Sequence, residues 1–306
     1  MDPIRGIVAA PVLPMTADFE VDYDGLRSYL RWLVPQRPTA VAVNMDAGEG
    51  PALSLEERLR VIEVSREAVE DACPVWSGLI AGSTREAEAQ GRALARAGAQ
   101  GLAVFPPVPT FMGEPLPWRL PYEYHRAIGE ATGLPLVLFQ FARGLGPSYS
   151  NEALCRLAEI PQVVAMKEAT FDAGRLVETL AALRAAPKPL AVLTGSDTFL
   201  CEAYVLGAHG GLIGFGGIAL DLQVKMFEAV QQHDYAAAFA IWDRIGPIAK
   251  MMWGPPLRDY RPRMKEALVM QGVLRCAAVR PPMLAISDDE RRTIRRLLEQ
   301  AGLLPG

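Results

Sequence analysis

The sequence predicts a (β/α)8 barrel followed by a short helical region. Short runs of β-favouring apolar residues alternate with longer amphipathic stretches along most of the 306 residues. Several of the short runs are nearly continuous in Val, Ile, Leu and Ala, which is typical of parallel strands covered by helices on both faces. There are eight such runs, each followed by a helical pattern, and this repeat indicates a closed parallel barrel.

The expected strands are short and regularly spaced. They are Gly6–Val12, Ala40–Val43, Val75–Ile80, Gly101–Phe105, Leu134–Phe139, Val163–Met166, Leu190–Leu193 and Gly211–Phe215. The helices expected between and after them are Asp24–Val34, Ser54–Val69, Ser83–Gly98, Tyr122–Ala131, Asn151–Ala158, Gly174–Leu183, Asp197–Leu206 and Asp221–Gln231. The alternative fold, a doubly wound open sheet, is disfavoured because the units number eight and no GxGxxG motif follows the first strand.

Three more helical patterns follow the eighth unit, over Tyr235–Met251, Arg261–Gly272 and Ser287–Gly302. We therefore expect a barrel over residues 1–233 and a C-terminal helical domain over residues 234–306. The length suits this division, because 306 residues is long for one average domain and short for two.

Composition excludes several classes of function. The net charge is −4 without a basic stripe, so neither nucleic acid nor an anionic membrane is an expected partner. No apolar run reaches membrane-spanning length and no signal-peptide pattern opens the sequence, so we expect a cytoplasmic protein. The histidines and cysteines are scattered; they are His125, His209, His233, Cys73, Cys155, Cys201 and Cys276. We expect neither a metal site nor a disulfide framework.

Lysine is rare in this chain. Of 31 basic residues only five are lysines, namely Lys167, Lys188, Lys225, Lys250 and Lys265. A nucleotide bias in the source genome explains such a ratio without reference to function. Arginine nevertheless cannot replace lysine where a neutral amine is needed, so each remaining lysine is a candidate for such a role.

Lys167 directly follows the sixth strand run, Val163–Met166. Barrel active sites lie at the carboxyl ends of the strands, so this side chain is expected to point into the barrel mouth, half desolvated. Burial lowers the pKa of an amine, and a neutral amine attacks a carbonyl to form a Schiff base. The alternative is a lysine that caps the strand end and bonds loop carbonyls.

Six segments, in this order, resemble the dihydrodipicolinate synthase / N-acetylneuraminate lyase family of class I aldolases. They are Gly48-Glu49 followed by Leu53–Arg58, Ser83–Ala87, Phe105–Pro107, Val163–Glu168, Thr194–Asp197 and Val279–Pro282. The similarity covers almost the whole chain. It implies a barrel with a C-terminal helical domain, no cofactor, and a homo-oligomer, either a dimer or a tetramer. It also implies that Lys167 forms a Schiff base with pyruvate or another 2-oxo acid.

The expected site departs from the family pattern. The family's Gly-Thr-Thr-Gly-Glu loop, which holds the 2-oxo acid carboxylate, is Met45–Glu49 here, so both hydroxyls are absent and Asp46 stands beside the carboxylate position. The proton-shuttling tyrosine of the fifth strand is Phe139, and the paired tyrosines after the fourth strand are Val108-Pro109. These departures argue against a genuine dihydrodipicolinate synthase and against feedback inhibition by lysine.

Several residues are candidates for the missing functions. Asp46 is a candidate general acid or base if it is buried, and a turn aspartate otherwise. Arg143 would pair with a substrate carboxylate or lie on the surface, and Gln140 is an expected polar contact. Tyr149 would lean into the mouth or pack at the start of the fifth helix. The remaining expected binding residues are Ala10, Ala47, Gly48, Phe139, Gly195 and Ile213.

Glu49 and Glu168 are expected to orient loops through hydrogen bonds rather than to react. Three functions remain open at this point. The first is a Schiff-base lyase (aldolase, dehydratase or deaminase) that acts on a 2-oxo acid or a sugar-acid derivative. The second is a non-catalytic relative that binds a 2-oxo acid or serves in assembly. The third is a barrel that holds a phosphate on glycines after strands seven and eight, which the absence of a nearby basic residue disfavours. The retained Lys167 favours the first.

Overall fold

The computed structural model describes residues 4–112, 116–141, 146–186 and 188–305. Within them, parallel strands pair in sequence order and close between the first and the last, which confirms the (β/α)8 barrel. The strands are β1 (Gly6–Ala9), β2 (Ala40–Val43), β3 (Val75–Leu79), β4 (Leu102–Val104), β5 (Leu136–Phe141), β6 (Val163–Ala169), β7 (Ala191–Thr194) and β8 (Gly210–Ile213).

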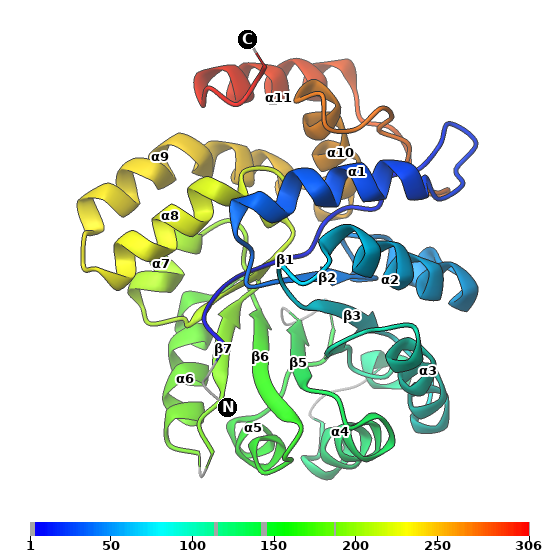
Figure 1. Cartoon of the computed structure of the whole chain (residues 1–306). Helices are drawn as coiled ribbons and strands as arrows, with labels where there is room; N and C mark the ends of the chain where they lie inside the picture. The colour runs from blue at the N-terminus through cyan, green and yellow to red at the C-terminus, as the bar shows by residue number, and fades with distance from the viewer. Residues whose placement is uncertain (1–3, 113–115, 142–145, 187, 306) are drawn as a thin grey trace.

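Helices follow the strands and cover the outside of the barrel (Figure 1). They are α1 (Tyr23–Leu33), α2 (Leu55–Val69), α3 (Thr84–Arg96), α4 (Arg119–Thr132), α5 (Asn151–Ala158), α6 (Ala173–Arg184), α7 (Leu200–Val205) and α8 (Leu220–Gln231). The C-terminal helices are α9 (Tyr235–Met252), α10 (Tyr260–Met270) and α11 (Asp288–Gln300).

Local sequence signals explain where these helices begin. The Ser54 hydroxyl accepts from the backbone N–H of Glu57, whose carboxylate accepts from the Ser54 N–H, so α2 starts with a full capping box. Ser287 and Glu290 form the same reciprocal pair at the start of α11. At α3, Ser83 caps the helix from its side chain. Such caps satisfy backbone donors that the first turn leaves unpaired.

Most strands differ from the expected runs by about one or two residues at an end, and β1 and β6 differ most. β1 ends at Ala9, and the apolar residues after it continue as buried loop. β6 continues through Lys167 to Ala169, so the lysine lies within the strand rather than after it. Lys167 is in register with Phe139 on β5 and with Leu193 on β7. The polar Lys-Glu pair did not end the strand because both neighbouring strands supply backbone partners there.

The C-terminal helices pack against the last units of the barrel. α9 lies along α8, and α10 and α11 gather beyond α1 at the top of Figure 1. The expected division after residue 233 falls in the turn between α8 and α9 and stays a prediction. Among the described residues, no helix is both long and apolar enough to cross a membrane.

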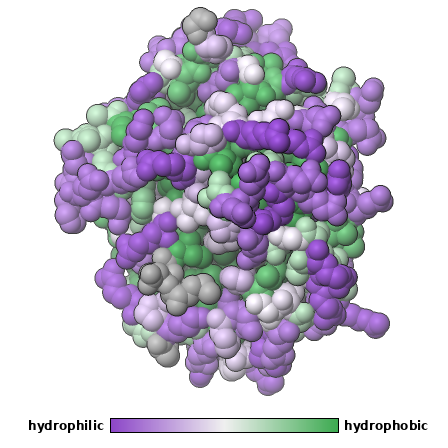
Figure 2. All heavy atoms as spheres, viewed as in Figure 1, coloured by the Kyte–Doolittle hydropathy of each residue, from purple (hydrophilic) through white to green (hydrophobic). Residues whose placement is uncertain are grey.

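The outer surface is mostly polar on the face that Figure 2 shows, with hydrophobic side chains in separate patches. The apolar residues instead fill the barrel and the layer between barrel and helices. This arrangement leaves the carboxyl ends of the strands as the place where side chains from many elements meet, as in other barrels of this kind.

Candidate active site

A cavity of about 160 Å³ opens at the carboxyl ends of the strands. Its lining comes from several barrel strands and their loops and from the segment that follows α9. The lining residues are Ala10, Met45, Asp46, Ala47, Phe139, Phe141, Lys167, Ala169, Phe171, Gly195, Asp197, Gly214, Trp253, Leu257 and Tyr260. Most are apolar, and the few polar groups converge on one lysine, which is the usual composition of a small-molecule site.

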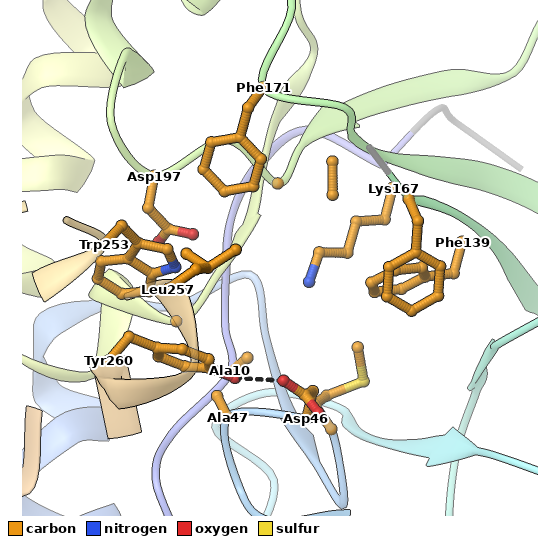
Figure 3. Close-up of a pocket in the computed structure, with 15 residues that line it drawn as sticks. Ala10, Asp46, Ala47, Phe139, Lys167, Phe171, Asp197, Trp253, Leu257 and Tyr260 are labelled. Atoms are coloured by element: carbon orange, nitrogen blue, oxygen red, sulfur yellow. Dashed lines mark hydrogen bonds between the residues drawn. The ribbon is translucent and has the colours of Figure 1, made fainter. Parts of the chain in front are cut away.

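Lys167 extends its amine into this cavity (Figure 3). Burial lowers the pKa of the Lys167 amine to about 8, although the nearby carboxylates of Asp197 and Asp46 act in the opposite direction. The Nζ atom lies 4.5 Å from the centre of the Phe139 ring. A side chain at Gly195 would place its Cβ 2.6 Å from the lysine Cε, so the absence of one leaves room for the amine.

Asp197 faces the cavity with its side chain almost fully enclosed. Its Oδ1 accepts a hydrogen bond of 2.8 Å from the Phe215 backbone N–H. Burial raises the pKa of the Asp197 carboxyl to about 7, against the hydrogen bond and the charge of Lys167, which favour the ionised form. A carboxyl with such a pKa exists in both protonation states near neutral pH.

Asp46 reaches the cavity from the loop after β2 and is held by the C-terminal part. The Tyr260 hydroxyl donates to its Oδ2 at 2.7 Å, and the Arg261 guanidinium lies 2.5 Å from the same oxygen. Arg261 also donates to the Asp46 carbonyl. The side chain is 42 % exposed, so the burial that the acid/base hypothesis required is not found. Instead the charge is compensated by a paired arginine.

Among the described residues, no group of three or more His, Cys, Asp or Glu side chains is placed to hold a metal ion. The cavity lining contains the Lys167 amine, the carboxyls of Asp46 and Asp197 and the Tyr260 phenol within aromatic walls. Such a set can add to a carbonyl and exchange protons beside it.

Comparison with known proteins assigns the chain to a family. The profile of the dihydrodipicolinate synthetase family matches residues 3–301. The chain belongs to that family. A 4-hydroxy-tetrahydrodipicolinate synthase of Neisseria gonorrhoeae is 31 % identical over 303 residues, covering 98 % of this chain and 100 % of the relative. One from Methylibium petroleiphilum is 31 % identical over 308 residues, covering 99 % and 100 %.

Solved structures of the dihydrodipicolinate synthetase family have the same fold. The chloride-inhibited dihydrodipicolinate synthase of Acinetobacter baumannii, solved with pyruvate, superposes with a TM-score of 0.87 at 28 % identity. The match covers 98 % of this chain and 100 % of that one. The expected resemblance is thereby confirmed at the level of family and fold.

The structure brings part of the expected site of this dihydrodipicolinate synthetase family member together. Lys167, Asp46, Ala10, Ala47, Phe139 and Gly195 line the cavity. Gln140 and Ile213, which were also expected there, are not among the lining residues. Side chains alternate along a strand, so Phe139 and Phe141 face the cavity while Gln140 points away and accepts from the Tyr149 N–H. Gly48 also stands outside the lining, packed toward the Pro11 carbonyl.

Four other residues singled out from the sequence are not among the lining of the cavity. Arg143 lies outside the described residues. The Tyr149 ring is buried against His125 rather than in the mouth. Glu168, in β6, accepts from the N–H of Thr170 directly after the strand, a hydrogen bond of the orienting kind expected for it. Glu49 accepts from the Arg280 N–H and pairs with a lysine of α10.

Sequence reasoning missed the contribution of the C-terminal part. Trp253, Leu257 and Tyr260 line the cavity, although they follow the barrel by many residues. Asp197 stood in a segment that carries the family resemblance, but no role was assigned to it. The aromatic residues at β5 and after β6, Phe141 and Phe171, carried no polar signal that would have separated them from core residues.

Proposed function

We propose that this chain is a Schiff-base lyase in which Lys167 attacks the carbonyl of pyruvate or another 2-oxo acid. The observation that carries the proposal is the cavity-facing amine, whose pKa burial lowers to about 8. The iminium formed on Lys167 withdraws electrons from the neighbouring carbon, which makes cleavage or formation of the adjacent C–C or C–O bond possible. No cofactor is part of the proposed reaction.

The loop after β2 supplies a place for the 2-oxo acid carboxylate. Ala47 lines the cavity, and the backbone N–H groups of Ala47 and Gly48 donate to no acceptor in the described part of the chain. Free backbone donors of this kind bind anions. Pairing with Arg261 reduces the repulsion between the Asp46 carboxylate and an acid bound beside it.

Two carboxyls are available for proton exchange. We keep Asp46 as a proposed acid/base although it is not buried, because the Tyr260 hydroxyl that donates to it provides a partner for proton exchange at the cavity. Asp197 is a second candidate, and its pKa of about 7 suits a group that both takes and returns a proton at neutral pH. Phe139 has no oxygen, so this reaction uses groups other than a tyrosine at that position.

We propose further that the second reactant is not that of a dihydrodipicolinate synthase, because Phe139 and Ala47 lack the hydroxyls that the family pattern places there. The alternative is a non-catalytic relative that binds a 2-oxo acid or serves in assembly. We also propose a cytoplasmic homo-oligomer, a dimer or tetramer, on the ground of the family alone.

Deuterium exchange at the methyl group of pyruvate separates the lyase from the non-catalytic binder. An enamine on Lys167 forms and collapses reversibly, so pyruvate in D2O should lose its methyl proton signal by NMR when the protein is added. Lys167→Arg keeps the charge but cannot form an imine, and exchange should fall to the background rate. Lys188→Arg, a lysine that donates to backbone carbonyls far from the cavity, is the matched control and should exchange normally. Pyruvate binding without exchange would favour the binder.

A further inference from the structure

We infer that the second reactant carries an aryl ring or a similarly flat apolar group. The substrate class would then be 4-aryl-4-hydroxy-2-oxo acids, cleaved to pyruvate and an aryl aldehyde, or formed from them. This inference rests on the proposed function and deepens it, because it concerns the part of the substrate beyond the carbonyl that Lys167 attacks.

The cavity has aromatic side chains on two opposite sides (Figure 3). Phe139 stands beside Lys167 on one side, and Trp253 and Tyr260 stand across the cavity from them. Trp253 and Tyr260 stack on each other with ring centres 5.3 Å apart and planes 20° apart. Phe139 in turn stacks on Phe105, with ring centres 4.3 Å apart. Phe105 therefore supports Phe139 from behind, while Trp253 and Tyr260, which both line the cavity, support each other.

Phe171 and Leu257 also belong to these apolar walls, and both are only partly buried. Half-exposed apolar side chains around a cavity gain free energy when a ligand covers them. Aromatic pairs add about 0.5–1.5 kcal/mol beyond area burial in offset or edge-to-face geometry, which a flat ring can adopt between such walls.

The volume of the cavity is about that of one ring-sized group, so a bound 2-oxo acid leaves room inside it for only part of a ring. It is about 160 Å³, with an opening to solvent. An apolar protein cavity of about 150 Å³ accommodates benzene. A 2-oxo acid joined to Lys167 would occupy the deep end, so the ring would lie toward Trp253 and Leu257 and extend into the opening.

The polar groups argue against the other common aldehyde classes. Apart from Lys167, the polar side chains that line the cavity within the described residues are Asp46, Asp197, Tyr260 and the indole of Trp253. A polyhydroxylated chain needs a partner for each hydroxyl it buries, and the walls offer few. Within the described residues, a second carboxylate would face two aspartates, one of them already paired with Arg261, and this repulsion disfavours a dianionic substrate.

The reaction balances with the groups present. The Lys167 amine adds to the C2 carbonyl and water leaves, forming the iminium. A base takes the C4 hydroxyl proton, the C3–C4 bond breaks, and the electron pair moves into the iminium to give an enamine while the aryl aldehyde leaves. Protonation of the enamine at C3 and addition of water to the imine release pyruvate and regenerate the amine. No oxidant or reductant is consumed.

Aldol addition of pyruvate to different aldehydes tests the inference. Benzaldehyde, butanal and glyceraldehyde are offered at matched concentrations, and the 4-hydroxy-2-oxo acid product is quantified by mass spectrometry. We expect kcat/KM for benzaldehyde to exceed that for glyceraldehyde by about 10-fold or more, the discrimination that an apolar pocket achieves. Trapping of pyruvate on Lys167 by borohydride is measured in parallel.

The parallel readout separates the two claims. Pyruvate trapped on Lys167 with equal or better turnover of glyceraldehyde, or with no aldol product from any aldehyde, overturns the aryl substrate class and leaves the Schiff base standing. Absence of any trapped 2-oxo acid overturns the proposed function and this inference with it.

Variants of the outer wall give a second test. Trp253→Ala and Leu257→Ala should each lower kcat/KM for benzaldehyde by about 10-fold while pyruvate trapping is unchanged. Trp253→Phe retains a flat ring and should restore most of the loss. Phe239→Ala removes an aromatic side chain of α9 that is 39 % exposed and not part of the lining, and serves as the matched control. Unchanged benzaldehyde kinetics in folded Trp253→Ala and Leu257→Ala would contradict the inference.

Discussion

The groups around the Lys167 amine determine its pKa and therefore the fraction of it that is neutral. Burial lowers its pKa to about 8, while Asp197 and Asp46 hold it higher than burial alone would. Compared with an ordinary lysine, this pKa increases the neutral fraction at pH 7 by more than about 100-fold. The rate of imine formation with pyruvate should therefore rise with pH up to about 8 and level off above it, as measured by stopped-flow borohydride trapping. A rate that keeps rising to pH 10 would contradict this environment.

The two carboxylates can be told apart through the same pH profile. Asp197→Asn and Asp46→Asn each remove a negative charge that stabilises the protonated amine, so the midpoint should move to lower pH, and further for Asp197. A merely structural role of either residue would leave the midpoint in place.

The steady-state rates of the same two variants show which carboxyl exchanges the proton. The variant that removes the acid/base should lower the steady-state rate by about 10²–10⁴-fold. Tyr260→Phe should share the loss only if Asp46 is that group, because Tyr260 donates to Asp46. Full activity of Asp46→Asn would remove it from the mechanism.

At the residue scale, the sequence located the lysine and only some of its neighbours. Strand order and the expected strand end placed Lys167 at the mouth, and the loop after β2 placed Asp46 there. Gln140 was expected at the site and Phe141 was not, because a single position along β5 decides which face of the strand a side chain occupies. That register depends on how β5 pairs with β6, and this pairing cannot be read from the sequence alone.

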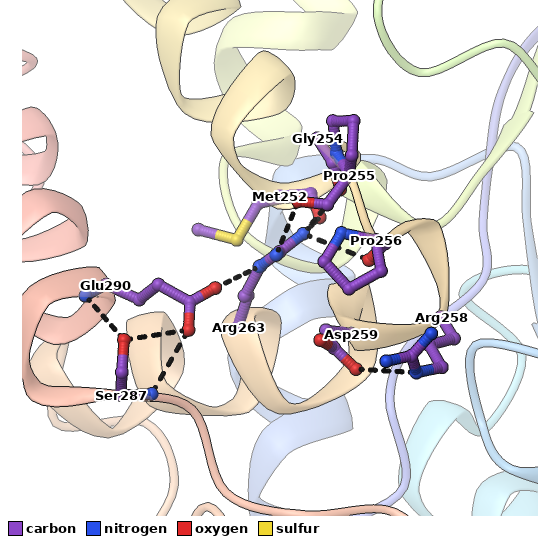
Figure 4. A network of polar contacts seen from close by, with 9 residues as sticks. All are labelled: Met252, Gly254, Pro255, Pro256, Arg258, Asp259, Arg263, Ser287 and Glu290. Carbon is purple, nitrogen blue, oxygen red and sulfur yellow. Dashed lines mark hydrogen bonds and ion pairs between the residues drawn. The ribbon is translucent and has the colours of Figure 1, made fainter.

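The element that completes the cavity is the segment after α9, and one arginine holds it. Arg263, 3 % exposed, donates to the carbonyls of Met252, Gly254 and Pro255 and pairs with Glu290 of α11 at 2.9 Å (Figure 4). The same segment carries Trp253 into the cavity. α11 therefore positions part of the substrate wall although it does not reach the wall itself.

Substitution of Arg263 should make the part of the cavity wall that Trp253 forms less rigid. Arg263→Gln leaves the carbonyls of Met252, Gly254, Pro255 and Pro256 and a carboxylate with fewer partners, and it should cost about 2–4 kcal/mol of unfolding free energy. It should raise the KM for benzaldehyde and leave deuterium exchange of pyruvate unchanged. Arg126→Gln breaks exposed pairs on α4 and, as the control, should change stability by less than about 1 kcal/mol. Equal effects of the two variants in denaturant titration would argue against the clamp.

Helical periodicity predicted α9, α10 and α11 but not which of their residues would face a ligand. Trp253 and Tyr260 sit at a helix end and a helix start, where the amphipathic pattern is ambiguous. Their place in the site follows from how α9 and α10 fold back over the barrel, and that packing involves long-range contacts.

Across the whole molecule, a buried ion pair joins barrel and C-terminal helices. The Lys265 amine of α10 donates to Glu49 Oε1 at 2.5 Å and to the Ala278 carbonyl, and the two side chains are 0 % and 3 % exposed. Glu49 belongs to the loop that also carries Asp46. The same loop thus links the proposed acid/base to the attachment of the C-terminal part.

Breaking this pair should destabilise the molecule as a whole. Glu49→Gln leaves a buried lysine without its counter-ion and should lower the unfolding free energy by about 3–5 kcal/mol in a single transition. Glu49→Gln with Lys265→Met should recover part of that loss. Asp289→Asn, which breaks an exposed pair on α11, is the control and should have little effect. Two separate unfolding transitions in Glu49→Gln would instead support two independent domains.

The fold of the whole molecule was predictable because its signal is repeated eight times. Each βα unit carries an apolar run and an amphipathic stretch, so an error in one boundary, as at β1 or β6, did not change the architecture. The site has no such redundancy. It combines single residues from distant units, and only the resemblance to a family pointed to several of them at once.

The central claim is that Lys167 forms a Schiff base with a 2-oxo acid, and reductive trapping tests it most directly. The protein is incubated with pyruvate, reduced with borohydride and digested, and the modified peptide is mapped by mass spectrometry, with Lys167→Arg treated in parallel. The account predicts a pyruvyl adduct on Lys167 in the parent protein and none in the variant. An adduct on another lysine, or no adduct with pyruvate or any other 2-oxo acid tried, would contradict it.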